Sequence, residues 1–222
     1  MDVAVVEFPG SNCDQDTVHV LREVLGLGAE LVWHNDFTNA KYDAAVLPGG
    51  FSFGDHLRGG AIAAHSPATE HVVEMAKQGR PVLGICNGFQ TLTEAELLPG
   101  ALLRNTCLKF VCKWMTLQVE NEDTAFTCLI PKGSLLRIPI AHNEGRFYAE
   151  DKELDRLERE ERVVMRYVGD NPTGTARGIT GVVNEKGNVL GMMPHPERAS
   201  DPALGGTDGL KVFESMVEWA RC

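Results

Sequence analysis

The sequence predicts an α/β fold with a mixed, mainly parallel central sheet and helices on both of its faces. In the first half, short apolar runs alternate with amphipathic helical segments, which is typical of parallel strands joined by crossover helices. In the second half, strand-like runs follow one another directly, which favours antiparallel pairing. The chain has 222 residues, of which 43% are hydrophobic, so we expect a single domain over residues 1–222.

The first half is expected to begin with a strand, a loop and a helix. An almost continuously apolar run, VAVVEF, precedes a helical stripe of Val18, Leu21 and Leu25, with Asn12 as the predicted N-cap. The predicted strands cover residues 3–8, 30–34, 43–47 and 81–85, and the predicted helices cover residues 14–25, 68–77 and 87–97. Functional groups of such a sheet lie at the carboxyl ends of its strands.

The second half is expected to extend the sheet with antiparallel strands. Glu185-Lys186-Gly187 forms a predicted tight turn between the last two strands, and residues 151–162 form a charged, solvent-facing helix. The predicted strands cover residues 108–119, 135–140, 163–168, 181–184 and 188–191. Residues 208–222 form a terminal amphipathic helix with Leu210, Phe213, Met216, Val217 and Ala220 turned inward.

Charge and hydropathy exclude several classes of partner. The net charge is −10, and the lysines and arginines are scattered, which argues against binding to nucleic acid. No apolar run approaches the roughly 18 residues of a membrane span, so no membrane partner is expected. Met1-Asp2 opens directly into a strand without a basic leader or a cleavage site, and we therefore expect a cytoplasmic protein.

The cysteines indicate neither a disulfide framework nor a metal site. They form no C-x-x-C pair and have no histidine at zinc spacing, so we expect no metal. All except Cys86 are expected to be reduced and structural. The six are Cys13, Cys86, Cys107, Cys112, Cys128 and Cys222.

Cys86 has the local sequence of a nucleophile. It stands in a Gly-x-Cys-x-Gly pattern between a predicted buried strand and a predicted helix. A sharp strand-to-helix turn crowds the residues two before and two after the nucleophile, and Gly84 and Gly88 remove the clashing Cβ atoms. The helix N-terminus favours a thiolate, which is the reactive form of cysteine. The pattern therefore predicts a nucleophile elbow.

A histidine and a carboxylate that could serve this cysteine follow the last predicted strand. Pro194 and Pro196 flank His195 and hold its backbone extended, so that Glu197, two residues on, projects to the same side. Such a carboxylate orients a catalytic base and stabilises its imidazolium form. His142 is the alternative base, although its segment lacks rigid flanking residues.

The predicted oxyanion site combines two backbone N–H groups. One belongs to Asn87, the residue after the nucleophile, and the other to Gly50, in the paired glycines that end a predicted strand. The same glycines are equally compatible with an ordinary tight turn. A phosphate loop is not indicated, because the G-x-x-x-x-G-K-[ST] pattern is absent.

Taken together, these motifs resemble the class I, or triad, glutamine amidotransferases, which implies their flavodoxin-like fold. Four segments narrow the resemblance to the glutaminase subunits of phosphoribosylformylglycinamidine synthases. They are VVEFPGSNCD at 5–14, LPGGFSFGDHLR at 47–58, IAHNEGRF at 140–147 and GMMPHPER at 191–198. Asn143 stands where glycine is expected, and we expect asparagine to tolerate a left-handed backbone there.

The resemblance implies a reaction and a role for each residue. Cys86 attacks the side-chain amide of glutamine, His195 passes protons to the leaving ammonia, and Glu197 orients His195. Gln90 corresponds to a substrate-contacting glutamine of the family, although its helix position alone is equally compatible with a polar surface residue. The thioester is hydrolysed to glutamate.

The resemblance also implies partners that this chain must serve. The ammonia passes to a large ATP-dependent synthetase subunit that forms formylglycinamidine ribonucleotide, accompanied by a small accessory subunit. No cofactor is expected in this chain, whereas ATP and magnesium are expected in the synthetase. Nothing in the sequence resembles an ATP site, which supports a subunit that feeds another chain.

Two other functions fit part of the pattern. Another elbow-cysteine hydrolase, such as a γ-glutamyl hydrolase, would explain Cys86 and His195 but not the VVEFPGSNCD opening. A non-catalytic assembly subunit would keep the fold, but it would not need an intact Cys86, His195 and Glu197.

Overall fold

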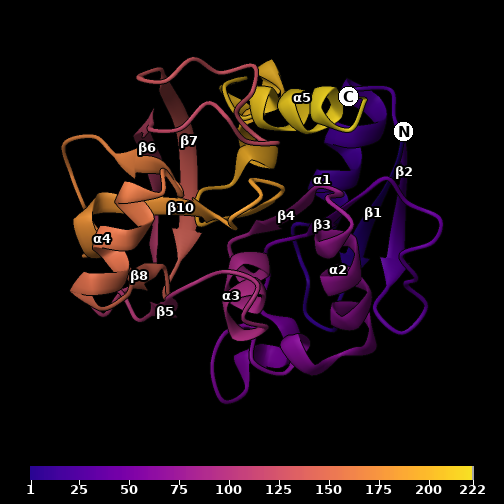
Figure 1. Cartoon of the computed structure of the whole chain (residues 1–222), viewed down its shortest axis with the longest axis horizontal. Helices are drawn as coiled ribbons and strands as arrows, with labels where there is room; N and C mark the ends of the chain where they lie inside the picture. The colour runs from indigo at the N-terminus through magenta and orange to yellow at the C-terminus, as the bar shows by residue number, and fades with distance from the viewer. Residues whose placement is uncertain (222) are drawn as a thin grey trace.

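The first half of the chain alternates strands and helices. The computed structural model describes residues 1–221, and Figure 1 shows the indigo and magenta first half beside the orange second half. The first half contains β1 (Asp2–Glu7), α1 (Asp14–His19), a π-helical turn (Val20–Val24), β2 (Gly28–Trp33), β3 (Ala44–Leu47), α2 (Pro67–Lys77), β4 (Val82–Ile85) and α3 (Asn87–Glu94).

The second half consists mainly of strands. Its elements are β5 (Ala101–Leu103), β6 (Val111–Val119), β7 (Leu135–His142), β8 (Arg146–Tyr148), α4 (Asp151–Arg159), β9 (Val163–Tyr167), β10 (Ile179–Val183), β11 (Val189–Met192) and α5 (Leu210–Trp219). No described helix is both long and apolar enough to cross a membrane.

The central sheet is mixed, as predicted. Over the described residues it has nine strands in the order β2-β1-β3-β4-β11-β10-β9-β6-β7. The strands from β2 to β11 run parallel, and each later neighbour pairs antiparallel to the one before it. Helices α1 and α5 lie on one side of the parallel part, and α2 and α3 lie on the other (Figure 1). The predicted fold class is therefore confirmed.

The register of the sheet brings three strand ends together. Leu47 at the end of β3 lies opposite Gly84 of β4, and Ile85 at the end of β4 lies opposite Met192 at the end of β11. All residues of these three strands are buried, as expected for a sheet covered on both faces. The loops after β3, β4 and β11 consequently meet at one edge of the sheet.

Several local predictions need correction. Asn12 does not cap the first helix, which begins after Cys13 and has no side-chain cap; the Asn12 side chain instead accepts a hydrogen bond from Cys13 Sγ at 3.2 Å. Four predicted helices end earlier, at His19 before the π-helical turn, at Glu94, at Arg159 and at Trp219. The short pair β5 and β8 forms a separate two-stranded sheet that was not predicted. Residue 222, assigned to the terminal helix and read as a structural cysteine, lies outside the described residues.

The two elbow glycines are required by close packing. A Cβ atom on Gly88 would lie 2.0 Å from the carbonyl oxygen of Leu47 in β3. A Cβ atom on Gly84 would lie 2.5 Å from the side chain of Leu92 and 2.7 Å from the backbone of Gly88. The start of α3 therefore sits directly on β3 and β4, and this contact orients the turn between strand and helix.

We predict that Gly88→Ala lowers the free energy of unfolding by about 3 kcal/mol, because the new methyl group meets backbone that cannot rotate away. Urea denaturation measures the loss. Gly133→Ala is the control: nothing lies within 4 Å of its Cβ position, and its φ of +86° leaves only the strain of a left-handed backbone, about 1 kcal/mol. Equal losses in both variants would contradict the packing constraint at Gly88.

Candidate active site

Cys86 occupies the turn between β4 and α3 in a strained backbone conformation. Its φ of 51° and ψ of −102° lie outside the regions that L-residues favour. Its N–H donates to Met192 O at 2.8 Å, which ties the turn to β11. Such strain persists only where the surrounding structure holds it in place, and it is concentrated at functional sites. The predicted elbow is present in the structure.

The thiol of Cys86 lies at the bottom of a pocket. The residue is 6% exposed, and its Sγ makes one long contact, 3.9 Å, to Ala141 O. It directly precedes α3, whose first N–H groups have no partner within the helix. These groups and the positive end of the helix dipole favour negative charge beside the sulfur.

His195 and Glu197 form a buried pair beside this pocket. His195 Nδ1 lies 2.6 Å from Glu197 Oε1, and the two residues are 1% and 0% exposed. The contact was predicted, but its geometric reason was wrong. The chain turns into a 3-10 helix at Pro196–Ala199, and this turn, rather than an extended backbone, brings the carboxylate to the ring.

The charges around His195 favour its imidazolium form. Burial opposes the charge, but the carboxylate of Glu197 and the charge of Cys86 outweigh burial and raise the pKa of His195 well above 6.5. Nε2, the nitrogen remote from Glu197, has no hydrogen-bond partner among the described residues. This buried nitrogen is therefore available to move a proton at Cys86.

The pocket unites most of the predicted site residues. It has a volume of about 440 Å³, and its lining includes Gly50, Cys86, Gln90 and His195. A pocket of this size suits a small molecule. Asn87 and Glu197 do not line it; both are buried, Asn87 at the start of α3.

Gly50 lies where the β3 loop meets the segment after β1. A Cβ atom there would lie 2.7 Å from Gly10 O and from Ser11 Cα, so only glycine fits. Within residues 1–221, the hydrogen bonds of this loop use Gly49 O and the N–H of Phe51, and the N–H of Gly50 has no protein partner. That N–H therefore remains available to a ligand.

The side chain of Gln90 belongs to a network in the pocket wall. Its Oε1 accepts from Asn87 Nδ2 at 2.8 Å, and its Nε2 donates to Glu144 O at 2.7 Å. Asn87 Oδ1 accepts from the N–H of Ser52 at 3.0 Å. Gln90 is thus 6% exposed and is not a surface residue. Its direct contact with substrate stays a prediction.

His142, the alternative base, also lines the pocket but lacks an orienting carboxylate. Neither of its ring nitrogens has a hydrogen-bond partner among the described residues. Burial, followed by repulsion from His195, lowers its pKa to about 3. His142 is therefore neutral where His195 is charged, which favours His195 as the group that holds the proton.

Cys13 is a neighbour of the pair that sequence reasoning missed. Its Sγ, a ring nitrogen of His195 and a carboxylate oxygen of Glu197 all lie within 4.8 Å of one another. Cys13 Sγ also accepts a hydrogen bond from Arg198 Nη2 at 3.0 Å. These three are zinc-ligand types, but His195 and Glu197 bind each other here. The sequence feature that could have pointed to Cys13 is the VVEFPGSNCD motif, which contains it.

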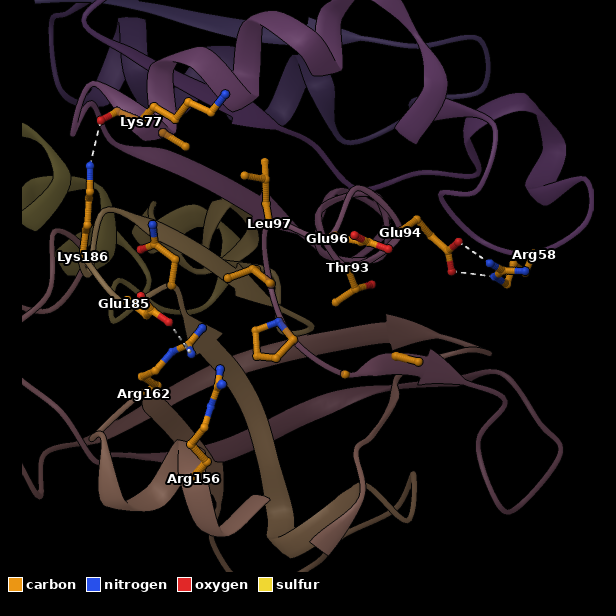
Figure 2. A pocket seen from close by; sticks show the side chains of 16 residues that line it. Arg58, Lys77, Thr93, Glu94, Glu96, Leu97, Arg156, Arg162, Glu185 and Lys186 are labelled. Carbon is orange, nitrogen blue, oxygen red and sulfur yellow. Dashed lines mark hydrogen bonds and ion pairs between the residues drawn. The ribbon is translucent and has the colours of Figure 1, made fainter. Parts of the chain in front are cut away.

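A second cavity lies away from this chemistry. It has a volume of about 800 Å³ and lies between α2, α3, α4 and the turn from β10 to β11. Figure 2 shows Arg58 paired with Glu94 and Arg162 beside Glu185. Its described lining contains neither cysteine nor histidine. Although it is larger, its described lining therefore offers no cysteine–histidine pair for acyl chemistry.

Comparison with known proteins identifies the family. Residues 1–220 match the family described as CobB/CobQ-like glutamine amidotransferase domain. The chain belongs to this family. In this member of the family, Cys86 and His195 line one pocket and Glu197 lies beside His195.

Two individual proteins are similar to this chain over nearly its whole length. Phosphoribosylformylglycinamidine synthase subunit PurQ of Methanosarcina barkeri is 52% identical over 227 residues, 99% of this chain and 98% of that protein. PurQ of Trichormus variabilis is 53% identical over 218 residues, 98% of this chain and 97% of that protein.

A solved structure is also similar to this chain over nearly its whole length. A chain in the structure of PurLQS from Thermotoga maritima is 47% identical, covers 98% of both chains and superposes with a TM-score of 0.90. The predicted resemblance to amidotransferase subunits of this synthase is thereby confirmed.

Asn143 needs no left-handed backbone in this amidotransferase. It is not among the described residues with positive φ, and its carbonyl accepts from the N–H of Asn105 at 2.9 Å. The left-handed backbone that we expect asparagine to tolerate at this position is therefore not adopted.

We predict that Glu197→Gln reduces ammonia release from glutamine less than His195→Ala, because the amide still orients the ring but no longer balances its charge. Without the carboxylate, burial lowers the pKa of His195. The variant should therefore lose the imidazolium at a lower pH, and the alkaline limb of the kcat/KM profile should move to lower pH.

The matched measurement is the pH profile of both variants after their folding has been verified by circular dichroism. An unmoved alkaline limb, or a loss in Glu197→Gln equal to that in His195→Ala, would contradict this division of roles.

Proposed function

We propose that this chain is the glutaminase subunit of a phosphoribosylformylglycinamidine synthase. It hydrolyses glutamine and delivers ammonia to an ATP-dependent synthetase subunit, which converts formylglycinamide ribonucleotide to formylglycinamidine ribonucleotide in purine biosynthesis. The observation that carries the proposal is Cys86 at a strained elbow beside the His195–Glu197 pair. About 52% identity to PurQ of Methanosarcina barkeri over nearly the whole length supports the choice of complex.

The first half of the reaction forms a thioester. Cys86 Sγ attacks the side-chain amide carbon of glutamine, and the N–H groups of Asn87 and Gly50 stabilise the negative oxygen. His195 gives the proton on Nε2 to the amide nitrogen. The C–N bond then breaks and ammonia leaves, while the glutamyl group stays on the sulfur.

The second half of the reaction restores the enzyme. Water gives a proton to His195 Nε2 while its oxygen attacks the thioester carbon, and the C–S bond breaks. Glutamate leaves, so that glutamine and water have become glutamate and ammonia. Throughout, Glu197 holds the ring in place and balances its charge.

We predict that Cys86→Ser abolishes glutamine-dependent synthesis in the complex while synthesis from added ammonium salt survives, because the synthetase does not need the sulfur. Product formation with each nitrogen source measures this. Cys128→Ser, at an exposed position away from the active-site pocket, is the control and should retain both activities. Equal loss of both activities in Cys86→Ser would contradict a dedicated glutaminase role.

The rival functions predict different behaviour. A γ-glutamyl hydrolase would act fully without any partner, and an assembly subunit would release no ammonia under any condition. The similarity to PurQ of Trichormus variabilis over 98% of this chain favours neither rival.

The remaining expectations concern the surroundings of the subunit. ATP and magnesium act in the synthetase, this chain uses no cofactor of its own, and a small accessory subunit completes the complex in the cytoplasm. The name of the related PurLQS structure supports a three-part assembly.

We assign the synthetase-facing surface to the rim of the active-site pocket. Four large apolar side chains, otherwise costly in water, stay exposed on two loops: Phe51, Leu57, Leu108 and Phe110. Phe51 and Phe110 line the pocket itself. A partner that covers this rim would receive ammonia without its escape to water.

We predict that the isolated chain is a poor glutaminase and gains about 100-fold in turnover when docked with a synthetase that holds its substrates. Hydrolysis without an acceptor wastes glutamine, and a glycine-bearing loop such as that of Gly50 can withhold one oxyanion donor until a partner sets it. Loss of one such donor costs roughly 10²–10³ in rate. Steady-state ammonia release by the lone chain and by the complex is the measurement, and equal turnover would contradict partner-dependent activation.

A further inference from the structure

Two carboxylates, Asp55 and Glu144, line the pocket that holds Cys86. Asp55 ends the short 3-10 turn at Ser52–Asp55 after β3, and Glu144 follows β7. The proton transfers described above use neither of them. The presence of these two carboxylates in the pocket is therefore not explained by the proton transfers.

The network around Gln90 contacts the carboxylate of Asp55 and the main-chain carbonyl of Glu144. Asn87 Nδ2 donates to Asp55 Oδ1 at 3.2 Å and to Gln90 Oε1 at 2.8 Å. Gln90 Nε2 donates to Glu144 O at 2.7 Å. Asp55 also adopts a left-handed backbone with φ of 52°, which an aspartate tolerates better than most residues. The loop after β3 and the loop after β7 are thus joined through the start of α3, which directly follows the nucleophile.

Asp55 carries a negative charge that no ion pair compensates in the described part of the chain. Burial, followed by repulsion from Glu144, raises the pKa of Asp55 to about 6, although the hydrogen bond from Asn87 opposes the shift. In the described part of the chain no lysine, arginine or histidine forms an ion pair with Asp55. Glu144 contacts Arg104 at 3.4 Å, but the Arg104 side chain is 72% exposed, so water screens that pair.

We propose that Asp55, with Glu144 beside it, binds the α-ammonium group of the substrate glutamine. The inference rests on the proposed function, because it takes glutamine as the occupant of the pocket. With its side-chain amide at Cys86, glutamine extends its amino-acid end toward the pocket wall. A free amino acid carries the cation that Asp55 lacks, and a charge-assisted hydrogen bond to Asp55 selects it.

The contact with Asp55 recognises the amino-acid end of glutamine, whereas Cys86 and His195 act on its side-chain amide. An ammonium group held by Asp55 sets the depth at which the glutamine side chain enters, and Asn87, which donates to Asp55, is the residue next to the nucleophile. An uncharged or deaminated amide leaves the carboxylates unpaired in the pocket, which costs binding energy. The pocket therefore rejects amides that are not amino acids.

The experiment compares two substrates in the reconstituted complex. One is glutamine, and the other is 5-amino-5-oxopentanoate, which keeps the amide and the carboxylate but lacks the α-amino group. Asp55→Asn is the test variant, because its side-chain oxygen can still accept from Asn87 Nδ2 and so preserves the network. Glu70→Gln, an exposed carboxylate on α2, is the matched control.

We expect Asp55→Asn to lower kcat/KM for glutamine by about 10- to 100-fold, mostly through KM, as for the loss of one charged hydrogen bond. The value for 5-amino-5-oxopentanoate should stay within about twofold or rise, because that substrate has no cation to lose. Glu144→Gln should show the same trend with a smaller change, since its main-chain oxygen still holds Gln90. Glu70→Gln should change neither value.

Equal losses for both substrates in Asp55→Asn would overturn the proposal and leave Asp55 as a support for Asn87. An unchanged value for glutamine would overturn it as well. Failure of the proposed function looks different, because the unaltered complex would then release no ammonia from glutamine at all.

Discussion

The structure depends on one backbone constraint, the left-handed turn at Cys86 between β4 and α3. L-residues avoid this conformation, and here the contact of Gly88 with Leu47 O and the hydrogen bond from the Cys86 N–H to Met192 O hold it. Both partners belong to the strands that flank β4. The sheet order thus places the thiol at one edge, and the start of α3 supplies the backbone N–H groups around it.

The pair of His195 and Glu197 is the second requirement, and it comes from the neighbouring strand β11. Burial alone would keep the imidazole neutral, so the carboxylate beside it decides its charge. His142 shows the opposite result in the same pocket, because burial without a carboxylate lowers its pKa to about 3. Two histidines in one cavity therefore differ in charge, because His195 lies beside Glu197 and Cys86, whereas His142 has no acidic partner and is repelled by His195.

Sequence reasoning was most successful where the determining residues are close together in the chain. The elbow is encoded within Gly84–Gly88, and the pairing of His195 with Glu197 within one short segment. Even there the 3-10 turn at Pro196–Ala199 was missed, because a proline-flanked histidine is compatible with both extended and turned backbone. Cys13 beside His195, and Asp55 near Glu144, depend on which strands become neighbours, and no local pattern encodes that order. The short strands β5 and β8 were missed for the same reason, since among the described residues each pairs only with the other, across more than 40 residues of chain.

The central claim is that Cys86 carries a glutamyl group during turnover. The most direct measurement is mass spectrometry of the complex mixed with glutamine and quenched in acid within its first turnovers, followed by peptide mapping. The account predicts a mass increase of one glutamyl group on the peptide that contains Cys86, which disappears when the quench is delayed until glutamine is exhausted. A glutamyl group found on the peptide that contains Cys13, or ammonia release at full rate with no adduct on any cysteine when deacylation is slowed, would contradict it.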